Sequence, residues 1–242
     1  TTEIYTLSLH DALPIWRWRD DGLNGAAELV RLGRPALIQT FDLRSFYYRA
    51  DAAAVLKQPF MDKLVEEAKL TRAGRSRAAD SIRALQAAID DPLSSILLDR
   101  FSAWRDVAIQ DGLLRSGGHV PLPIGCSSAR ILANVLLAPL DREIERAVRP
   151  WYFGRYVDDY LLVSDGEERV DVELLLKNVP GLTNSAANDS ADSGGLLGRT
   201  SLELADGKER DFYLTGTSGS ETLSQMRATF DRLSSERRLL PS

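Results

Sequence analysis

The sequence predicts a mixed α/β fold, in which a small, mainly antiparallel sheet is backed by helices. Residues 153–163 place β-branched and aromatic residues on both sides of Asp158 and Asp159, which is typical of two short strands joined by a tight turn. Residues 36–42 form an apolar run that is typical of a buried strand. Apolar residues recur at helical spacing within residues 51–111 and again after Ser127, which predicts the helices.

The composition is ordinary for a globular protein and excludes several classes of site. The 242 residues suffice for a large core, and the chain is 44% hydrophobic and 27% charged. The single cysteine excludes an internal disulfide and a cysteine-based zinc cluster. No run approaches 18 apolar residues, so we expect no membrane partner and a cytoplasmic protein. The net charge of −5 means that binding of nucleic acid would need a local basic surface.

Residues 1–15 resemble a translated sequencing adapter and lack the basic start of a signal peptide. We therefore expect them to be an artefact and the native chain to begin near Trp16. His119 is then the only native histidine, which argues against a Ser-His-Asp mechanism and a histidine-rich metal site. The segment from Trp16 to Arg34 is predicted to hold a short helix that ends near Pro35.

One carboxylate, Asp42, stands at the C-terminal end of the predicted strand 36–42. Strand ends beside a sheet are where α/β proteins usually build their sites. Aspartate is also a common helix cap, so Asp42 is open to a second interpretation, as the cap of the helix that follows.

Asp158 and Asp159 are adjacent carboxylates at the tip of the predicted turn. Like charges placed side by side repel, so the turn is costly unless a cation neutralises it. Mg²⁺ would do so, because hard cations prefer carboxylate oxygens. The alternative is an ordinary Asp-Asp hairpin turn.

A loop at residues 116–125 contains two prolines and three glycines and leads into a long apolar-periodic helix. Ser127 or Ser128 is the expected N-cap of that helix, and Pro139 is expected to kink or end it. Glycine in a loop that opens a helix lets the backbone approach a phosphate or a sugar. Residues 200–204 and 210–214 flank Asp206 and Gly207, which predicts a β-hairpin.

Three of these segments together resemble the motifs of reverse transcriptases. The sequence FDLRSFY at residues 41–47 resembles motif A, and VPLPIG at 120–125, with the serines and the Ala-Asn pair that follow, resembles motif B. The sequence YVDD at residues 156–159 is similar to motif C. The resemblance implies a polymerase palm at residues 36–215 with a helical insertion at 51–111. It further implies a remnant of truncated fingers at 16–35 and a partial thumb, the start of a C-terminal helical region, at 216–242.

The resemblance implies two-metal nucleotidyl transfer, in which one metal ion activates the attacking 3′-hydroxyl and the other supports the leaving group. Asp42, Asp158 and Asp159 would be the catalytic carboxylates. These residues and Leu43 would form the metal-binding set for Mg²⁺, with Mn²⁺ as an alternative. The expected partners are an RNA template, a DNA or RNA primer and dNTPs.

The same resemblance implies a nucleotide-binding set. Phe46 and Tyr47 end the segment that resembles motif A, and an aromatic ring at Tyr47 would clash with a ribose 2′-hydroxyl and so favour deoxynucleotides. Pro123, Ile124 and Gly125 would line the pocket for the templating base and the incoming nucleotide. A further member, Lys208, resembles a motif D lysine and would act on the leaving pyrophosphate.

Two departures from the family pattern bear on function. Ile124 replaces a glutamine that most reverse transcriptases carry, and such changes, with Arg130, resemble bacterial abortive-infection and defence-associated enzymes. Few residues precede Asp42, so the chain is expected to be a fragment that polymerises poorly. Two alternatives remain open: a template-independent or RNA-synthesising palm nucleotidyltransferase, and a catalytically silent palm that serves as a nucleic-acid-binding module.

Overall fold

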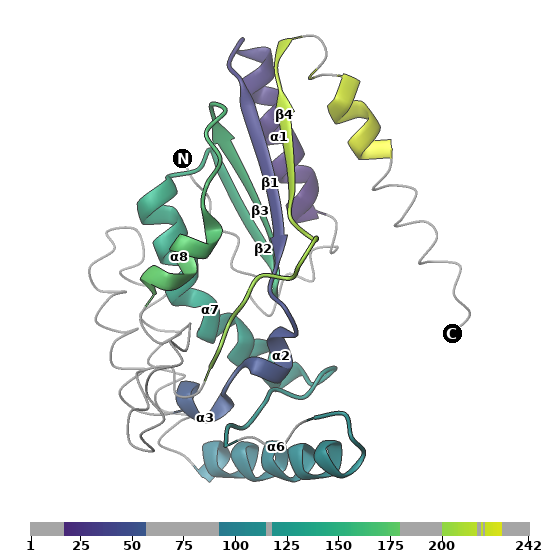
Figure 1. The fold of residues 1–242 in the computed structure, drawn as a ribbon, viewed down its shortest axis with the longest axis vertical. Coiled ribbons are helices and arrows are strands. Elements are labelled where there is room, and N and C mark those ends of the chain that lie inside the picture. The colour runs from purple at the N-terminus through teal and green to yellow at the C-terminus, as the bar shows by residue number, and fades with distance from the viewer. Residues whose placement is uncertain are drawn as a thin grey trace. The chain divides into compact units, whose positions relative to one another are not determined.

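The computed structural model describes residues 17–56, 92–114, 118–179, 200–216, 219 and 221–228. Its helices and strands are α1 (Arg17–Arg31), β1 (Ala36–Asp42), α2 (Phe46–Arg49), α3 (Ala52–Val55), α6 (Pro92–Gln110), α7 (Ser127–Val148), β2 (Tyr152–Tyr156), β3 (Asp159–Asp165), α8 (Val172–Asn178) and β4 (Arg210–Leu214). This content confirms the predicted mixture of helices and an antiparallel sheet (Figure 1).

The chain divides into two compact units. The sheet unit comprises the described residues of 1–44, 141–175 and 204–242, and the helical unit comprises those of 45–140 and 176–203. Among the described residues, no helix is both long and apolar enough to cross a lipid bilayer.

Within the described residues the sheet has four strands in the order β2-β3-β1-β4, and every neighbouring pair is antiparallel. Tyr156 of β2 pairs with Asp159 of β3, which leaves Val157 and Asp158 as a two-residue turn. The prediction of two strands joined by a tight turn is therefore confirmed. Its detail was wrong, since Asp159 is the first residue of β3 and does not lie at the tip.

The predicted hairpin around residues 205–209 was also wrong. Leu204 forms an isolated antiparallel bridge with Leu43, which directly follows β1. Arg210 pairs with Thr40 of β1 in the same antiparallel direction. Residues 204–214 therefore run along one side of β1 without reversing, and residues 205–209 bulge out of that run. Gly207 has a φ of 69°, so the glycine that suggested a hairpin turn serves a bulge instead.

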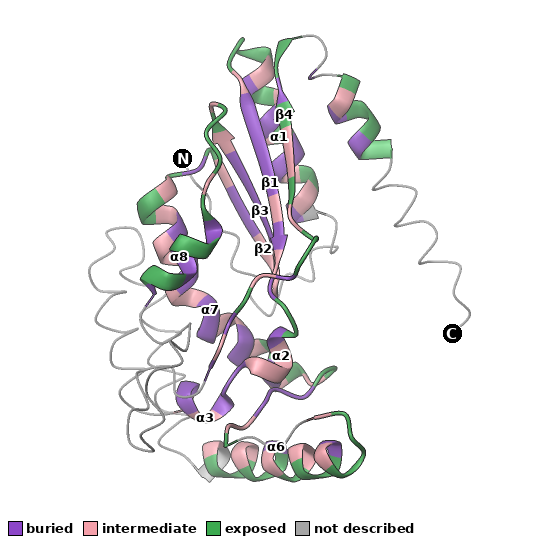
Figure 2. Cartoon of the chain, in the orientation of Figure 1, coloured by how far each residue is buried: buried purple, intermediate pink, exposed green. Residues whose placement is uncertain are grey.

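Side chains alternate between the two faces of the sheet, as the pleat requires. One face carries Ala36 and Ile38 of β1 and Leu161 and Val163 of β3, and it packs against the apolar side of α1. Figure 2 shows this buried stripe along the strands and along α1. The predicted helix before Pro35 is thus confirmed as α1, and its packing on the sheet forms the core of the unit.

Helix α1 approaches the sheet closely because it carries glycine at the contact. A Cβ on Gly22 would lie 2.4 Å from Leu161 Cδ2 and 3.1 Å from Tyr152 Cε1. One helical turn earlier, the Tyr152 hydroxyl donates to the Trp18 carbonyl oxygen at 2.6 Å. A Cβ on Gly25 would meet ordinary contacts, the nearest at 3.4 Å.

The opposite face of the sheet holds a buried ion pair. Arg155 of β2 donates from Nε and Nη2 to the two carboxylate oxygens of Asp141 at 2.9 and 2.7 Å, and the two side chains are 6% and 10% exposed. The hydroxyl of Tyr160 also donates to Asp141, at 3.4 Å, and its ring stacks on Phe41 with centroids 4.5 Å apart. A bidentate pair of this kind fixes β2 relative to the end of α7 that carries Asp141.

The helices predicted within residues 51–111 and after Ser127 are confirmed in the described part of the chain, but their ends differ from those predicted. Of residues 51–111, the helices α3 and α6 are described, and residues 57–91 lie outside the described part. The carbonyl of Cys126 accepts the bond from Arg130 N, so Cys126 occupies the cap position and Ser127 begins the helix. The helix does not end at Pro139 but continues to Val148.

We predict opposite effects from alanine at the two glycines of α1. Gly25→Ala should raise the free energy of unfolding by up to about 1 kcal/mol, because alanine is the better helix former and the site has room. Gly22→Ala should lower it by about 1–3 kcal/mol, because the new methyl group overpacks the core beside Leu161. Urea denaturation of both variants tests this, and equal stability of the two would show that α1 does not lie this close to the sheet.

We further predict that the Asp141–Arg155 pair is costly to break and cheap to replace. Arg155→Met alone should lower the free energy of unfolding by about 3–5 kcal/mol, because it leaves a buried unpaired carboxylate. The double variant Asp141→Leu with Arg155→Met should recover most of that loss. Guanidinium denaturation measures both, and a double variant no more stable than the single one would contradict the assignment.

Candidate functional site

The pairing of β1 with β3 brings the predicted carboxylates together. Asp42 lies directly opposite Asp159 in the register, and paired residues of an antiparallel sheet share a face. Asp158 precedes Asp159, and its backbone carbonyl accepts a hydrogen bond from Leu43 N at 3.2 Å. The segment after Asp42 is thereby tied to the turn that carries Asp158, so Asp42, Leu43, Asp158 and Asp159 lie at one end of the sheet.

The turn before Asp159 holds a strained residue. Val157 has a φ of 57°, a conformation that is rare for a β-branched side chain. In a two-residue hairpin turn, a positive φ at the first position is normally left to glycine. Arg155 donates from Nη1 to the Val157 carbonyl at 2.9 Å, so the Asp141–Arg155 pair also braces this turn. Strain of this kind, about 1–3 kcal/mol, is concentrated at functional sites.

The charge state of Asp158 reflects its surroundings. Burial raises the pKa of its carboxyl to about 6, the negative charges of Asp42 and Asp159 add to that rise, and Lys208 opposes it. A carboxylate in this position is ionised at neutral pH only at a cost in free energy. A bound cation would remove that cost.

Basic side chains bind the other two carboxylates. Lys208 Nζ contacts Asp42 Oδ2, and this hydrogen bond raises the pKa of the lysine. Arg19 Nη2 of α1 lies 3.5 Å from Asp159 Oδ2, with both side chains partly exposed. Lys208 was predicted to act on the leaving pyrophosphate. In the structure it contacts Asp42, which was predicted to be a metal ligand.

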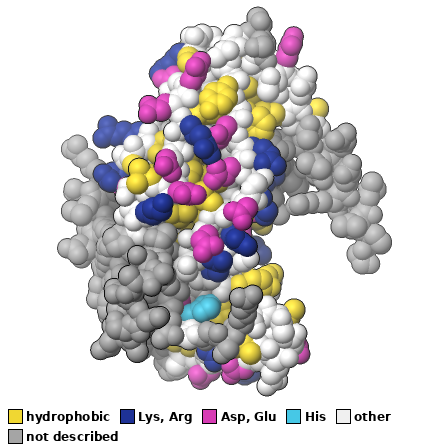
Figure 3. Space-filling view, viewed as in Figure 1, with side chains coloured by type: hydrophobic (Ala, Val, Ile, Leu, Met, Phe, Trp, Pro, Cys, Tyr) yellow, Lys and Arg dark blue, Asp and Glu magenta, His cyan; other side chains and the backbone are white. Residues whose placement is uncertain are grey.

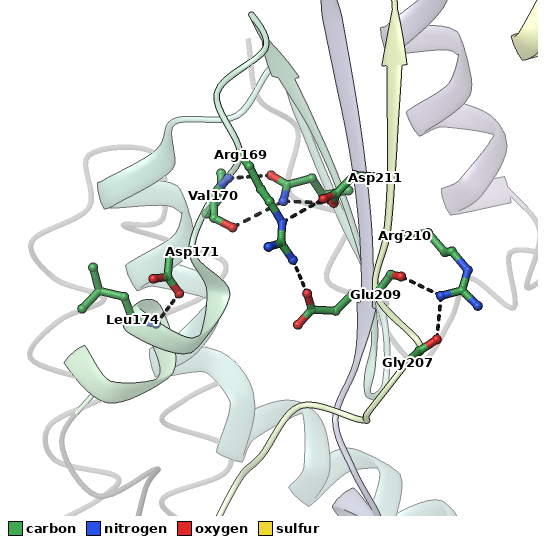
Figure 4. Close-up of polar contacts among 9 residues, drawn as sticks. Arg169, Val170, Asp171, Leu174, Gly207, Glu209, Arg210 and Asp211 are labelled. Atoms are coloured by element: carbon green, nitrogen blue, oxygen red, sulfur yellow. Dashed lines mark hydrogen bonds and ion pairs between the residues drawn. The ribbon is translucent and has the colours of Figure 1, made fainter.

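The bulge that carries Lys208 is anchored from the other side of β4 (Figure 4). Arg169 contacts Glu209 and lies 2.8 Å, through Nε, from Asp211 Oδ2. The buried Gln39 of β1 accepts from Val170 N at 2.9 Å and donates to the same Asp211 at 3.3 Å. These contacts hold the residues on either side of Arg210 and thereby restrict where Lys208 can reach.

A pocket of about 310 Å³ opens beside Asp42 and Asp159. Besides these carboxylates its lining includes four aromatic and three basic residues, namely Trp18, Phe41, Tyr160, Phe212, Arg19, Lys208 and Arg210. The sequence reasoning missed Arg19, Arg210 and Phe212 as site residues. Arg210 and Phe212 are two residues apart on β4, so both side chains lie on the face of the sheet that carries Asp42. This can be recognised only once β4 is known to pair with β1.

The carboxylate groups of the site are of the chemical type that binds a hard metal ion, but they do not form a complete coordination site. Within the described part of the chain, no three His, Cys, Asp or Glu side chains are grouped closely enough to hold a metal ion. The oxygens of Asp42, Asp158 and Asp159 are the kind that Mg²⁺ prefers. A metal ion here would compete with Lys208 for Asp42 and with Arg19 for Asp159.

The remaining predicted nucleotide residues belong to the helical unit. Leu122 N donates to the Tyr47 carbonyl at 2.9 Å, which joins the loop of Pro123, Ile124 and Gly125 to α2. Ile124 is 60% exposed, and Gly125 has a φ of 82°. Phe46 is buried and packs edge-on against Tyr47, so its side chain serves the core of this unit.

Charged side chains do not gather into one basic patch on the face shown in Figure 3. There, Lys and Arg side chains alternate with Asp and Glu side chains over the strands. The local basic surface that nucleic-acid binding would need is therefore not found on that face.

No protein-family model matches the chain, and a search of curated proteins finds no significant match. The three sequence motifs and the arrangement of charge at the end of the sheet are therefore the features that bear on function.

Proposed function

We propose that this chain carries the palm of a reverse transcriptase, an Mg²⁺-dependent enzyme that adds dNTPs to a 3′-hydroxyl on an RNA template. The observation that carries the proposal is the position of the carboxylates. Asp42 and Asp159 come from distant motifs, face each other across β1 and β3, and adjoin the strained turn of Asp158. Such a cluster is costly unless it binds cations.

In this proposal Asp42 and Asp158 are the principal metal ligands, with Asp159 and Leu43 completing the set. The bound ions would supply activation of the attacking hydroxyl and charge relief at the leaving group. Lys208, once displaced from Asp42, would be free to bind the leaving phosphates. Tyr47 would exclude ribonucleotides, and the exposed Ile124 would contact the template without hydrogen bonding.

The motif departures favour a bacterial defence setting for this enzyme. A template-independent or RNA-synthesising nucleotidyltransferase would use the same carboxylates, and substrate choice separates it from the main proposal.

One observation favours a second function, a silent palm that binds nucleic acid. Lys208 and Arg19 already neutralise Asp42 and Asp159 through side-chain contacts, so these two carboxylates have cationic partners without a metal ion. A palm of this kind would keep its biological activity when Asp158 is replaced.

We predict that Asp158 destabilises the metal-free protein above about pH 6. Its pKa is higher in the folded protein than in the unfolded chain, so the contribution to stability is complete below about pH 4 and is lost as the pH rises through about 6. Asp158→Asn should therefore raise the Tm at pH 8 by about 2–4 °C, which corresponds to about 1 kcal/mol after allowance for solvent, and should change it little at pH 4.

Thermal scans with and without Mg²⁺ extend the same test to the metal. At pH 8, Mg²⁺ should raise the Tm of the original chain and have a much smaller effect on Asp158→Asn. Asp206→Asn, at an exposed carboxylate that faces Arg44, is the matched control and should respond to Mg²⁺ as the original chain does. A Tm that is indifferent to Mg²⁺ in the original chain would contradict the metal site.

Because the chain is expected to be a fragment, we predict only slow Mg²⁺-dependent incorporation of dNTPs on a primed RNA template, and a further reduction of at least about 100-fold in Asp158→Ala because a metal ligand is lost. Asp206→Ala should retain full activity. Parallel reactions without template, without primer, or with ribonucleotides distinguish the alternative polymerases. If Asp158→Ala incorporates dNTPs as well as the original chain does, the enzyme proposal fails.

A further inference from the structure

A second pocket lies between α1 and the helical residues 221–228, and it shares no lining residue with the site at Asp42. Its volume of about 490 Å³ falls within the range of ligand-binding pockets. Its lining includes three apolar and two basic side chains, namely Ala27, Val30, Leu223, Arg31 and Arg227. No carboxylate is among the described residues that line it.

The elements that form the pocket are packed into the core of the sheet unit. Leu223 and Met226 of the helical residues 221–228 are buried and belong to the same apolar cluster as the inner side of α1. The side-chain oxygen of Asn24 on α1 accepts a hydrogen bond from Arg227 Nη2, which links the two helical segments. A Cβ built on Gly216, which also lines the pocket, would meet no atom within 4 Å beyond its chain neighbours. The space between the two segments is therefore open and has fixed walls.

The two arginines of this pocket carry charge that the described residues do not neutralise. Asn24, Ala27 and Arg31 lie on one stripe of α1, because residues three or four apart are neighbours on a helix surface. Within the described part of the chain, Arg31 forms no ion pair, and the partner of Arg227 is the neutral amide of Asn24. Both side chains are exposed, so their guanidinium groups are accessible to a ligand.

Other arginines of the sheet unit have carboxylate partners. Arg34 pairs with Asp165, and Arg169 lies 2.8 Å, through Nε, from Asp211 Oδ2. The whole chain carries a net charge of −5, so acidic partners are in ample supply. Two arginines that line one pocket without a carboxylate therefore form a local positive site in an acidic protein.

The chemistry of the pocket selects the class of ligand. The planar guanidinium group of arginine matches the two oxygens of a carboxylate or phosphate, which it can bind through paired hydrogen bonds. Val30 is partly buried and Leu223 is buried, so a ligand with an apolar body would cover apolar surface beside the two charges. A metal cation would be repelled by both arginines, and a neutral ligand would leave them unused.

We infer that this pocket binds a small organic anion that has one carboxylate or phosphate head and an apolar chain. Arg31 and Arg227 bind the head from two different helical segments, and Val30 and Leu223 contact the chain. This site is independent of the proposed nucleotidyl transfer, because it uses none of the carboxylates at the end of the sheet.

Calorimetry with three eight-carbon probes tests the pocket. Octanoate, octyl phosphate and octanol have the same chain and differ in the head, and each is titrated into the 242-residue protein. At least one of the two anions should bind with a Kd below about 1 mM. Octanol should bind at least about tenfold more weakly, because it offers no charge to the arginines.

Three pocket variants separate the contributions of charge and space. Arg31→Gln and Arg227→Gln should each weaken binding of the preferred anion about fivefold, the order expected for a partly exposed hydrogen bond to a charged group. Ala27→Met should weaken it by filling the space that the apolar chain occupies. Arg100→Gln changes an exposed arginine on α6 of the helical unit and is the matched control, which should bind as the original protein does. Circular dichroism of each variant establishes that it is folded before binding is compared.

Each result supports or overturns the site. Binding of an anion that is weakened in all three pocket variants and unchanged in Arg100→Gln supports it, and the tighter of the two anions identifies the preferred head. Octanol that binds as tightly as the anions shows that the arginines do not recognise charge, which overturns it. Absence of binding by the original protein, or equal binding by the pocket variants, overturns it as well.

The organic-anion pocket and the proposed enzyme can fail separately. Asp158→Ala should bind octanoate and octyl phosphate as the original protein does, whatever its effect on the incorporation of dNTPs. Conversely, Arg31→Gln should leave incorporation unchanged, because Arg31 does not line the pocket beside Asp42 and Asp159.

Discussion

The antiparallel pairing of β1 with β3 is the constraint on which the sheet unit depends. It sets Asp42 opposite Asp159, and it places the apolar residues of both strands on the face that α1 covers. A slip of one residue would turn the buried stripe towards solvent and separate the carboxylates. The same register therefore specifies the core and gathers the negative charge, so the protein cannot lose one without the other.

The carboxylate end of the sheet is braced from both faces. On one face, Tyr152 and the close approach at Gly22 hold α1, which brings Arg19 to Asp159. On the other, the buried Asp141–Arg155 pair reaches the Val157 carbonyl and holds the turn in an unfavourable conformation. Buried ion pairs contribute little net stability, so this one is better understood as a device that fixes geometry.

Much of this arrangement could be predicted from local sequence, and the part that could not depends on long-range register. The strands around Asp158 follow from alternation and turn chemistry, which are local. The bulge at Gly207 was mistaken for a hairpin turn, because a glycine with positive φ serves either and only the pairing of Arg210 with Thr40 distinguishes them. The contact of Arg19 with Asp159 likewise becomes visible only when α1 is docked on the sheet.

The place of β4 at the edge of the sheet divides the site into two parts with different resistance to opening. Arg210, Phe212 and, through the bulge, Lys208 depend on β4, which among the described strands pairs with β1 alone. The carboxylates belong to strands nearer the centre. Edge elements open with a smaller free energy than central ones. Fraying of β4 would thus disassemble the basic half of the pocket and free Asp42 from its lysine, while the paired carboxylates stay in register.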